Sequence, residues 1–206
     1  MAEYKPHKSA CAVYLASQSP RRRELLAQIG IAHRVLTVDI DERQRSGETP
    51  LDYVQRLARE KAAAGWQQLL MRQSGDQHLI LAPIIGADTA VVIDGDILGK
   101  PTDAADAMAM LQRLSGRDHE VLTGVAIHAA NAAQVVVSCT RVWFRALDRA
   151  EIEEYWASGE PRDKAGAYGI QGLAAKFIER IEGSYSGVVG LPLFETAQLL
   201  RSFGIE

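Results

Sequence analysis

Long apolar runs rich in β-branched residues fill the middle of this 206-residue chain. They span Leu79–Ile93, Val121–His128 and Val135–Phe144, and Asp94-Gly95 after the first run is a strong hairpin signal. Because Gly86-Ala87-Asp88 interrupts the first run, we interpret that run as a pair of strands. Successive strands joined by short turns pair in antiparallel fashion, so the sequence predicts an antiparallel meander at the centre of the fold.

Helical patterns alternate with short strand-like runs on both sides of this meander. Ser19-Pro20 and Thr49-Pro50 each predict a helix start, because the hydroxyl caps free N–H groups and proline suits the first helical turn. Further helices are expected at 102–114, capped by Thr102, at 148–157 and at 195–203, and further strands at 12–16, 33–38 and 176–181, the last in a hairpin through Gly183-Ser184. This order predicts an α/β (mixed α+β) fold in which helices flank a mixed sheet.

Composition and charge narrow the classes of protein. With 47% apolar residues and a net charge of −3, neither a disordered chain nor a bulk, sequence-independent binder of nucleic acid is expected. The longest apolar run, Leu79–Ile85, is too short to cross a bilayer, and the first ten residues lack the apolar core of a signal peptide. Cys11 and Cys139 form no CxxC and lie in apolar runs, so we expect buried, reduced thiols and a cytoplasmic location.

Three consecutive arginines, Arg21–Arg23, occupy the first turn of the helix that begins at Ser19-Pro20. The N-terminus of a helix carries the positive end of its dipole, so each exposed cation there is unfavourable by about 0.3–1 kcal/mol. The free N–H groups at this end bind anions. Together with the Ser17 and Ser19 hydroxyls, the arginines predict a site for a multiply charged anion. The alternative is a solvated basic turn whose arginines pair with nearby carboxylates.

Carboxylates gather in other parts of the chain. Asp39, Asp41 and Glu42 follow a strand-like run, and Asp88 lies among apolar strand residues, where burial is costly without a partner. Asp88 could cap a turn through backbone amides, but its flanking strands favour a position in a cleft, as a base or a metal ligand. Mg²⁺ is usually held by one or two carboxylates together with substrate phosphate oxygens. The anion site and the carboxylates therefore predict a metal-bound polyphosphate as ligand.

Several short motifs, taken in order, resemble the Maf family of nucleoside triphosphate pyrophosphatases. They are Leu15-Ala16-Ser17-Gln18-Ser19-Pro20-Arg21-Arg22, Gly86-Ala87-Asp88-Thr89, Lys100-Pro101, Lys164-Ala165-Gly166-Ala167-Tyr168-Gly169-Ile170-Gln171-Gly172 and Gly190-Leu191-Pro192-Leu193. The resemblance covers about residues 12–203 and implies the fold of the inosine triphosphate pyrophosphatases, with two α/β lobes of an elongated mixed sheet around a central cleft. We expect one Maf-like catalytic domain over 12–206 and a disordered tail over 1–11.

The resemblance also implies an activity and a set of catalytic residues. The family hydrolyses nucleoside triphosphates to the monophosphate and pyrophosphate with a divalent metal, and its proton acceptor corresponds to Asp88. Glu42, Lys61 and Lys100 match other polar positions of the family's cleft, although a solvated surface position is the default for a lysine. We expect Glu42 and Asp88 to hold Mg²⁺ or Mn²⁺. The predicted phosphate-binding residues are Ser17, Ser19, Arg21 and Arg22.

Three positions distinguish two branches of the family. The branch that cleaves dTTP and UTP has Arg, Thr and Gln there, whereas the branch that acts on 7-methyl-GTP tends to Trp, Gln and Glu. This chain has Arg21, Thr89 and Gln171, which resemble the dTTP/UTP type. A Gln amide offers one acceptor and two donors, which suit the N3–H and the carbonyls of uracil or thymine.

The expected ligand is thus a small-molecule nucleoside triphosphate, in a house-cleaning role that includes modified pyrimidine nucleotides. A membrane or nucleic-acid partner is not expected, and a homodimer is left open. Three alternatives remain: a pyrophosphatase for 7-methyl-GTP or another non-standard nucleotide, a nucleotide-binding regulator of septum formation that does not turn over, and a structural module that binds anions adventitiously.

Overall fold

A mixed seven-stranded sheet forms the centre of the protein. The computed structural model describes residues 12–76 and 79–206, so the expected disordered tail over 1–11, which includes Cys11, lies outside the described residues. The sheet order is β2-β1-β3-β5-β6-β7, and β4 pairs with β3 beside this path. The strands are β1 (Val13–Leu15), β2 (His33–Val35), β3 (Ile84–Ile93), β4 (Asp96–Leu98), β5 (Asp118–Ala129), β6 (Ala132–Phe144) and β7 (Ile178–Glu182). This confirms the predicted α/β class.

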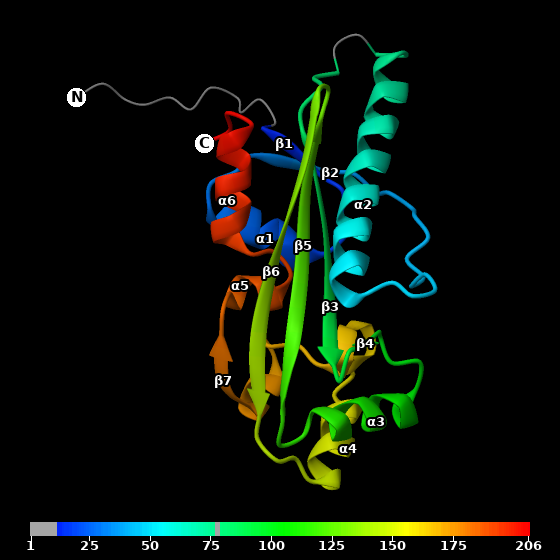
Figure 1. Cartoon of the computed structure of the whole chain (residues 1–206), viewed down its shortest axis with the longest axis vertical. Coiled ribbons are helices and arrows are strands. Elements are labelled where there is room, and N and C mark those ends of the chain that lie inside the picture. The colour runs from blue at the N-terminus through cyan, green and yellow to red at the C-terminus, as the bar shows by residue number, and fades with distance from the viewer. Residues whose placement is uncertain (1–11, 77–78) are drawn as a thin grey trace, which may run out of the picture.

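Helices flank the sheet on both faces and at one end (Figure 1). The longest helix, α2, runs along one face of β3 and β5, while α1 and α6 pack against the other face and α3 and α4 cover the far end of the β5–β6 hairpin. The helices are α1 (Pro20–Gln28), α2 (Pro50–Gln73), α3 (Ala104–Leu114), α4 (Arg149–Ala157), α5 (Tyr185–Val189) and α6 (Leu193–Ser202), with 3₁₀ turns η1 (Glu160–Asp163), η2 (Ala165–Ala167) and η3 (Leu173–Phe177).

One edge of β3 is shared by two different strands. β1 pairs in parallel with Ile84 and Ile85, and β4 pairs in antiparallel fashion with Val91–Ile93, while β5 occupies the whole of the opposite edge. The described residues place no strand beside Gly86–Ala90 on the first edge. The sheet is therefore open in the middle of β3, between a part built around β1 and β2 and a part built around β4, α3 and α4.

Two glycines bring helix α2 unusually close to the sheet. A Cβ atom on Gly86 would lie 2.3 Å from the Ala58 carbonyl oxygen, and one on Gly124 would lie 2.5 Å from the Val54 carbonyl oxygen. Gly86 and Gly124 face α2 from the neighbouring strands β3 and β5. Because neither has a side chain, the backbone of α2 rests directly on the sheet, and Lys61 of α2 reaches the middle of β3.

Most predicted helix starts are confirmed. The Ser19 and Thr49 hydroxyls accept hydrogen bonds from backbone N–H groups in the first turns of α1 and α2, and Asp148 forms a capping box with Glu151 at α4. Thr102 is a wrong prediction, because the Asp103 carboxylate accepts the bond from the Asp106 amide and caps α3. The helix expected at 195–203 is α6, which begins two residues earlier, whereas α5 was not predicted.

The strand predictions are confirmed in part. Asp94 and Gly95 both have positive φ and form the β3–β4 turn, as that hairpin type requires. Gly86-Ala87-Asp88 does not interrupt a strand, because β3 runs unbroken from Ile84 to Ile93. Gly183-Ser184 makes no hairpin either: β7 pairs with β6, and the segment leads instead into α5.

Two further expectations concern thiols and membranes. Cys139 is a free and exposed cysteine, so the expectation that it is buried is wrong. Cys139 lies on β6, where β5 covers one edge of the strand. The other edge pairs with β7 only from Arg141 onward. Within 12–76 and 79–206, no helix is long and apolar enough to cross a membrane.

Candidate active site

A cleft of about 960 Å³ opens at the uncovered edge of β3. Segments from both ends of the chain converge on it: the β1–α1 loop, the segment before α2, α2 itself, β3, the segment after β4, and the 3₁₀ turns. Every residue that the sequence predicts for the site lines this cleft, namely Ser17, Ser19, Arg21, Arg22, Glu42, Lys61, Asp88, Thr89, Lys100 and Gln171. Their catalytic and binding roles remain predictions.

A lysine lies between two carboxylates on the α2 side of the cleft. The Lys61 Nζ atom is 2.7 Å from Asp88 Oδ1 and 2.7 Å from Glu42 Oε1. We call Glu42, Lys61 and Asp88 the Lys61 cluster. The side chains of Lys61 and Asp88 are each only 11% exposed, whereas Glu42 is 55% exposed at the mouth of the cleft. Because Lys61 compensates its charge, Asp88 can remain in the middle of an apolar strand.

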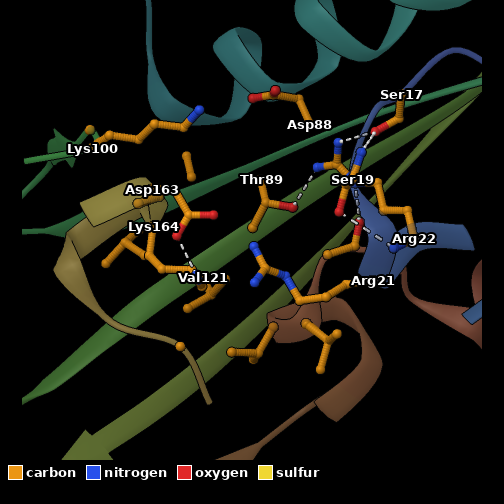
Figure 2. A pocket seen from close by; sticks show the side chains of 18 of the residues that line it. Ser17, Ser19, Arg21, Arg22, Asp88, Thr89, Lys100, Val121, Asp163 and Lys164 are labelled. Carbon is orange, nitrogen blue, oxygen red and sulfur yellow. Dashed lines mark hydrogen bonds and ion pairs between the residues drawn. The ribbon is translucent and has the colours of Figure 1, made fainter. Parts of the chain in front are cut away.

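The surroundings of the Lys61 cluster keep Glu42 ionised. Partial burial would raise the pKa of Glu42, but the hydrogen bond and charge of Lys61, with the charges of Lys100 and Arg22, outweigh it and lower the pKa. Burial and the nearby charges of Asp88 and Glu42 raise the pKa of Tyr53 to about 12, so that phenol stays protonated. Figure 2 shows the Lys100 side chain extending toward the side of the cleft on which Asp88 lies.

The arginines at the start of α1 differ from one another. Arg22 is held by three acceptors: its Nε donates to the Gly190 carbonyl (2.8 Å), Nη1 to Ser17 Oγ (3.3 Å) and Nη2 to Thr89 Oγ1 (3.2 Å). Burial lowers the Arg22 pKa, although Asp88 and Glu42 counteract this. Arg21 instead extends its guanidinium into the cleft (Figure 2). Arg22 therefore connects β1, β3 and the segment after α5, while Arg21 is placed to meet a ligand.

Asp88 and Thr89 are neighbours on β3 but project from its opposite faces (Figure 2). Asp88 faces α2, and Thr89 faces α1 and the segment after α5 through Arg22. Both line the same cleft because the cleft opens around the uncovered edge of the strand. A ligand at this edge can therefore contact two chemically different sets of residues at once.

Comparison with known proteins identifies the family. The model of the family described as "Maf-like protein" matches residues 12–203. The chain belongs to the Maf family. It is 57% identical to a protein of Hahella chejuensis over 192 residues, which cover 93% of this chain and 92% of that protein. It is 54% identical to one of Chromobacterium violaceum over 194 residues, 94% of this chain and 96% of that protein. A protein of Alkalilimnicola ehrlichii is 52% identical over 204 residues, which cover 99% of this chain and 96% of that protein. Each relative is named dTTP/UTP pyrophosphatase.

The carboxylates of this Maf-family cleft suit a divalent cation only in part. Among the described residues there is no group of three or more His, Cys, Asp or Glu side chains placed to hold a metal ion. Glu42 and Asp88 nevertheless converge, since each has an oxygen 2.7 Å from the same Lys61 nitrogen. Two carboxylates with substrate phosphate oxygens and water are a usual ligand set for Mg²⁺. The residues thus fit a metal that arrives with, or is completed by, a polyphosphate.

The sequence interpretation missed the residues that support the loop between η2 and η3, which carries Gln171. Glu160 lines the cleft, and its carboxylate accepts hydrogen bonds from the Tyr155 hydroxyl (2.7 Å) and the Leu173 amide (2.8 Å). A Cβ on Gly172 would overlap this carboxylate at 2.2 Å. The concentration of charged residues and glycines at 159–172 was the available signal for this contact. Lys164, which pairs with Asp163, also lines the cleft.

Proposed function

We propose that this Maf-family protein hydrolyses dTTP and UTP to the nucleoside monophosphate and pyrophosphate. The observation that carries the proposal is the Lys61 cluster, which shares one cleft with the arginine-rich start of α1. Acid–base groups and anion-binding groups are both needed to cleave a polyphosphate, whereas simple binding needs only the second set. The names of the relatives, dTTP/UTP pyrophosphatases at 52–57% identity, support the choice of substrate.

The proposed reaction is attack of water on the α-phosphorus. Asp88 accepts the proton as the water oxygen bonds to phosphorus, the bond from the α-phosphorus to the bridging oxygen breaks, and pyrophosphate leaves. Lys61 holds Asp88 and Glu42 in place, and its hydrogen bond and charge lower the pKa of Glu42. With phosphate oxygens completing the ligand set, Glu42 and Asp88 would hold Mg²⁺ or Mn²⁺, which supplies positive charge to the phosphates and acidifies water.

The phosphates are bound, in this proposal, by the other end of the cleft. Arg21 and the hydroxyls of Ser17 and Ser19 lie there, and the N–H groups at the start of α1 favour an anion. Lys100 adds a positive charge from the side of the cleft on which Asp88 lies. These groups balance the charge that collects on the leaving pyrophosphate. Arg22 adds its charge while its side chain remains fixed by the protein.

The base would be read by Thr89 and Gln171. The Gln171 amide has donors and an acceptor for the uracil or thymine edge, and Glu160 supports the loop that carries it. We also propose that the protein works in the cytoplasm on free nucleotides, including modified pyrimidine triphosphates, in a house-cleaning role. The alternative Maf-type activity, hydrolysis of 7-methyl-GTP, would be detected by the following experiment.

The test is product analysis over a panel of triphosphates with Mg²⁺, with Mn²⁺ and with a chelator. UTP, dTTP, CTP, GTP, ITP and 7-methyl-GTP are incubated with the protein, and the products are separated by chromatography. We expect UTP and dTTP to be cleaved fastest, to equal amounts of monophosphate and pyrophosphate, and only with metal. Preference for a purine would refute the pyrimidine assignment. Protection of the fold by UTP without turnover would refute the enzyme and favour a nucleotide-binding regulator.

A further inference from the structure

Behind Thr89 lies a second threonine that is out of reach of any ligand. Thr123 on β5 is the direct cross-strand partner of Thr89 on β3, and it is 0% exposed. The two hydroxyl oxygens are 3.0 Å apart. We call Thr89 and Thr123 the hydroxyl pair. Thr123 does not line the cleft, whereas Thr89 does and is partly exposed.

The direction of the hydrogen bond inside the hydroxyl pair follows from its neighbours. Thr123 Oγ1 is 2.8 Å from the Gly187 carbonyl oxygen, which can only accept, so Thr123 uses its single proton there. In a regular α-helix the Leu191 amide would donate to this Gly187 carbonyl, but here it donates to the Ser186 carbonyl instead. Thr123 therefore has only lone pairs left for Thr89, and the Thr89 hydroxyl must donate its proton to Thr123.

Arg22 imposes the same polarity on Thr89 from the other side. Its Nη2 donates to Thr89 Oγ1 at 3.2 Å, and a guanidinium has donors only. The Thr89 oxygen thus has its proton committed to Thr123 and one lone pair committed to Arg22. What remains available to a ligand is one lone pair. Although a free threonine hydroxyl can donate or accept, Thr89 in this cleft can only accept.

We infer that Thr123 is a positioning residue that fixes Thr89 as an acceptor, and that Thr89 thereby selects bases with an N3–H group. This inference rests on the proposed function. Uracil and thymine carry a hydrogen-bond donor at N3, whereas cytosine has an acceptor at N3 and otherwise nearly the same shape. An acceptor-only Thr89 bonds to the first two bases and is left facing a lone pair on cytosine. Selectivity for UTP over CTP is the measurable consequence.

The test replaces the Thr123 hydroxyl by a methyl group of similar size. In Thr123→Val the Thr89 proton is free to turn toward the cleft and donate to cytosine N3. We expect the ratio of kcat/KM for UTP to that for CTP to fall by about three- to tenfold, the value of one neutral hydrogen bond. Thr123→Ser keeps the hydroxyl and should keep the ratio within about twofold of that of the unmodified protein.

Thr140→Val is the matched control. Thr140 is a 1% exposed threonine on β6 whose hydroxyl also bonds to the α5 segment, donating to the Ser184 carbonyl and accepting from the Ser184 amide. Among the residues that the structure describes, Thr140 forms no hydrogen bond with Thr89, so its replacement should reduce stability without changing the UTP/CTP ratio. In a Thr89→Val background, Thr123→Val should not change the ratio further, since Thr123 acts through Thr89.

The outcomes separate the inference from the proposed function. Failure of the unmodified protein to release pyrophosphate from UTP would overturn the proposed function. If it does release pyrophosphate, an unchanged ratio in Thr123→Val, or an equal fall in Thr140→Val, would overturn the inference alone. Should Thr123→Val not fold, Thr123→Ala removes the same hydroxyl without adding a second methyl group, and the same ratios decide.

Discussion

The two faces of β3 differ in what their polar groups can do. On the α2 face, Asp88 belongs to the Lys61 cluster, whose members are ionisable and one of which, Glu42, reaches solvent. On the opposite face, Thr89 belongs to a set of hydrogen bonds that leaves its oxygen only one lone pair for a ligand. In the function that we propose, the first arrangement moves protons and the second recognises the base. Substitutions on the two faces should therefore change different measurable quantities.

The largest expected effect is that of Asp88→Asn. The amide cannot accept a proton from water, so kcat for UTP should fall by about 100-fold or more. Asp41, an exposed residue that precedes Glu42 in the sequence and pairs with Arg43, provides the control, and Asp41→Asn should stay within about twofold. Thermal unfolding of both variants separates loss of chemistry from loss of fold. An Asp88→Asn protein that cleaves UTP at the original rate would show that Asp88 is not the proton acceptor.

Lys61→Met should shift the pH dependence of the same face. The pKa of Glu42 is lowered by Lys61, so without Lys61 that pKa rises and Glu42 becomes protonated at a higher pH. Activity that needs ionised carboxylates is lost as the pH falls, and that loss should begin at a higher pH in the variant. We expect about a tenfold lower kcat/KM at pH 7. An acid limb of the pH–kcat/KM profile that stays in place would contradict the role given to Lys61.

Gly86→Ala tests whether close packing of α2 places the cluster. The new Cβ would lie 2.3 Å from the Ala58 carbonyl oxygen and 2.6 Å from the Ala62 amide nitrogen, so α2 must move away from the sheet. We expect a loss of about 1–3 kcal/mol in stability, together with a several-fold lower kcat. At Gly99 nothing lies within 4 Å of the new atom, so Gly99→Ala should change neither quantity. Equal behaviour of the two variants would count against the packing argument.

The smallest effect on activity is expected on the Thr89 face, where His119 is 2% exposed and contributes to stability alone. Burial lowers the pKa of His119 to about 4, below its ordinary 6.5. Between these values the unfolded imidazole binds a proton that the folded one does not, so stability falls as the pH drops from 6.5 to 4. The contribution is up to about 3 kcal/mol. His119→Leu should remove this part of the slope, measured by denaturant unfolding at several pH values, and equal slopes in both proteins would contradict it.

Local patterns predicted the parts of this molecule that local chemistry determines. Helix starts at Ser19, Thr49 and Asp148 were predicted because a cap acts over three residues. The site residues expected from the family resemblance all line one cleft. Asp88 was wrongly taken to interrupt a strand because its partner, Lys61, lies 27 residues earlier on a helix. An apolar pattern reports that a residue is buried and carries no information about such a distant partner.

The contacts that were missed are those between distant segments. Thr123 looks like an ordinary strand residue in the sequence, and only its contacts with Thr89 and Gly187 give it a role. Likewise, β7 pairs with β6, which lies far from it in the sequence, and no turn signal in the sequence predicts this pairing. Side-chain hydrogen bonds of this kind depend on strand register, which is fixed by the whole sheet rather than by neighbouring residues.

The most direct measurement of the central claim is hydrolysis of UTP in ¹⁸O-labelled water. Mass spectrometry of the products shows which phosphorus atom the water attacked. If the cleft directs water from Asp88 to the α-phosphorus, one ¹⁸O atom appears in UMP and none in the pyrophosphate released. Label in pyrophosphate, or release of inorganic phosphate and UDP, would contradict the account.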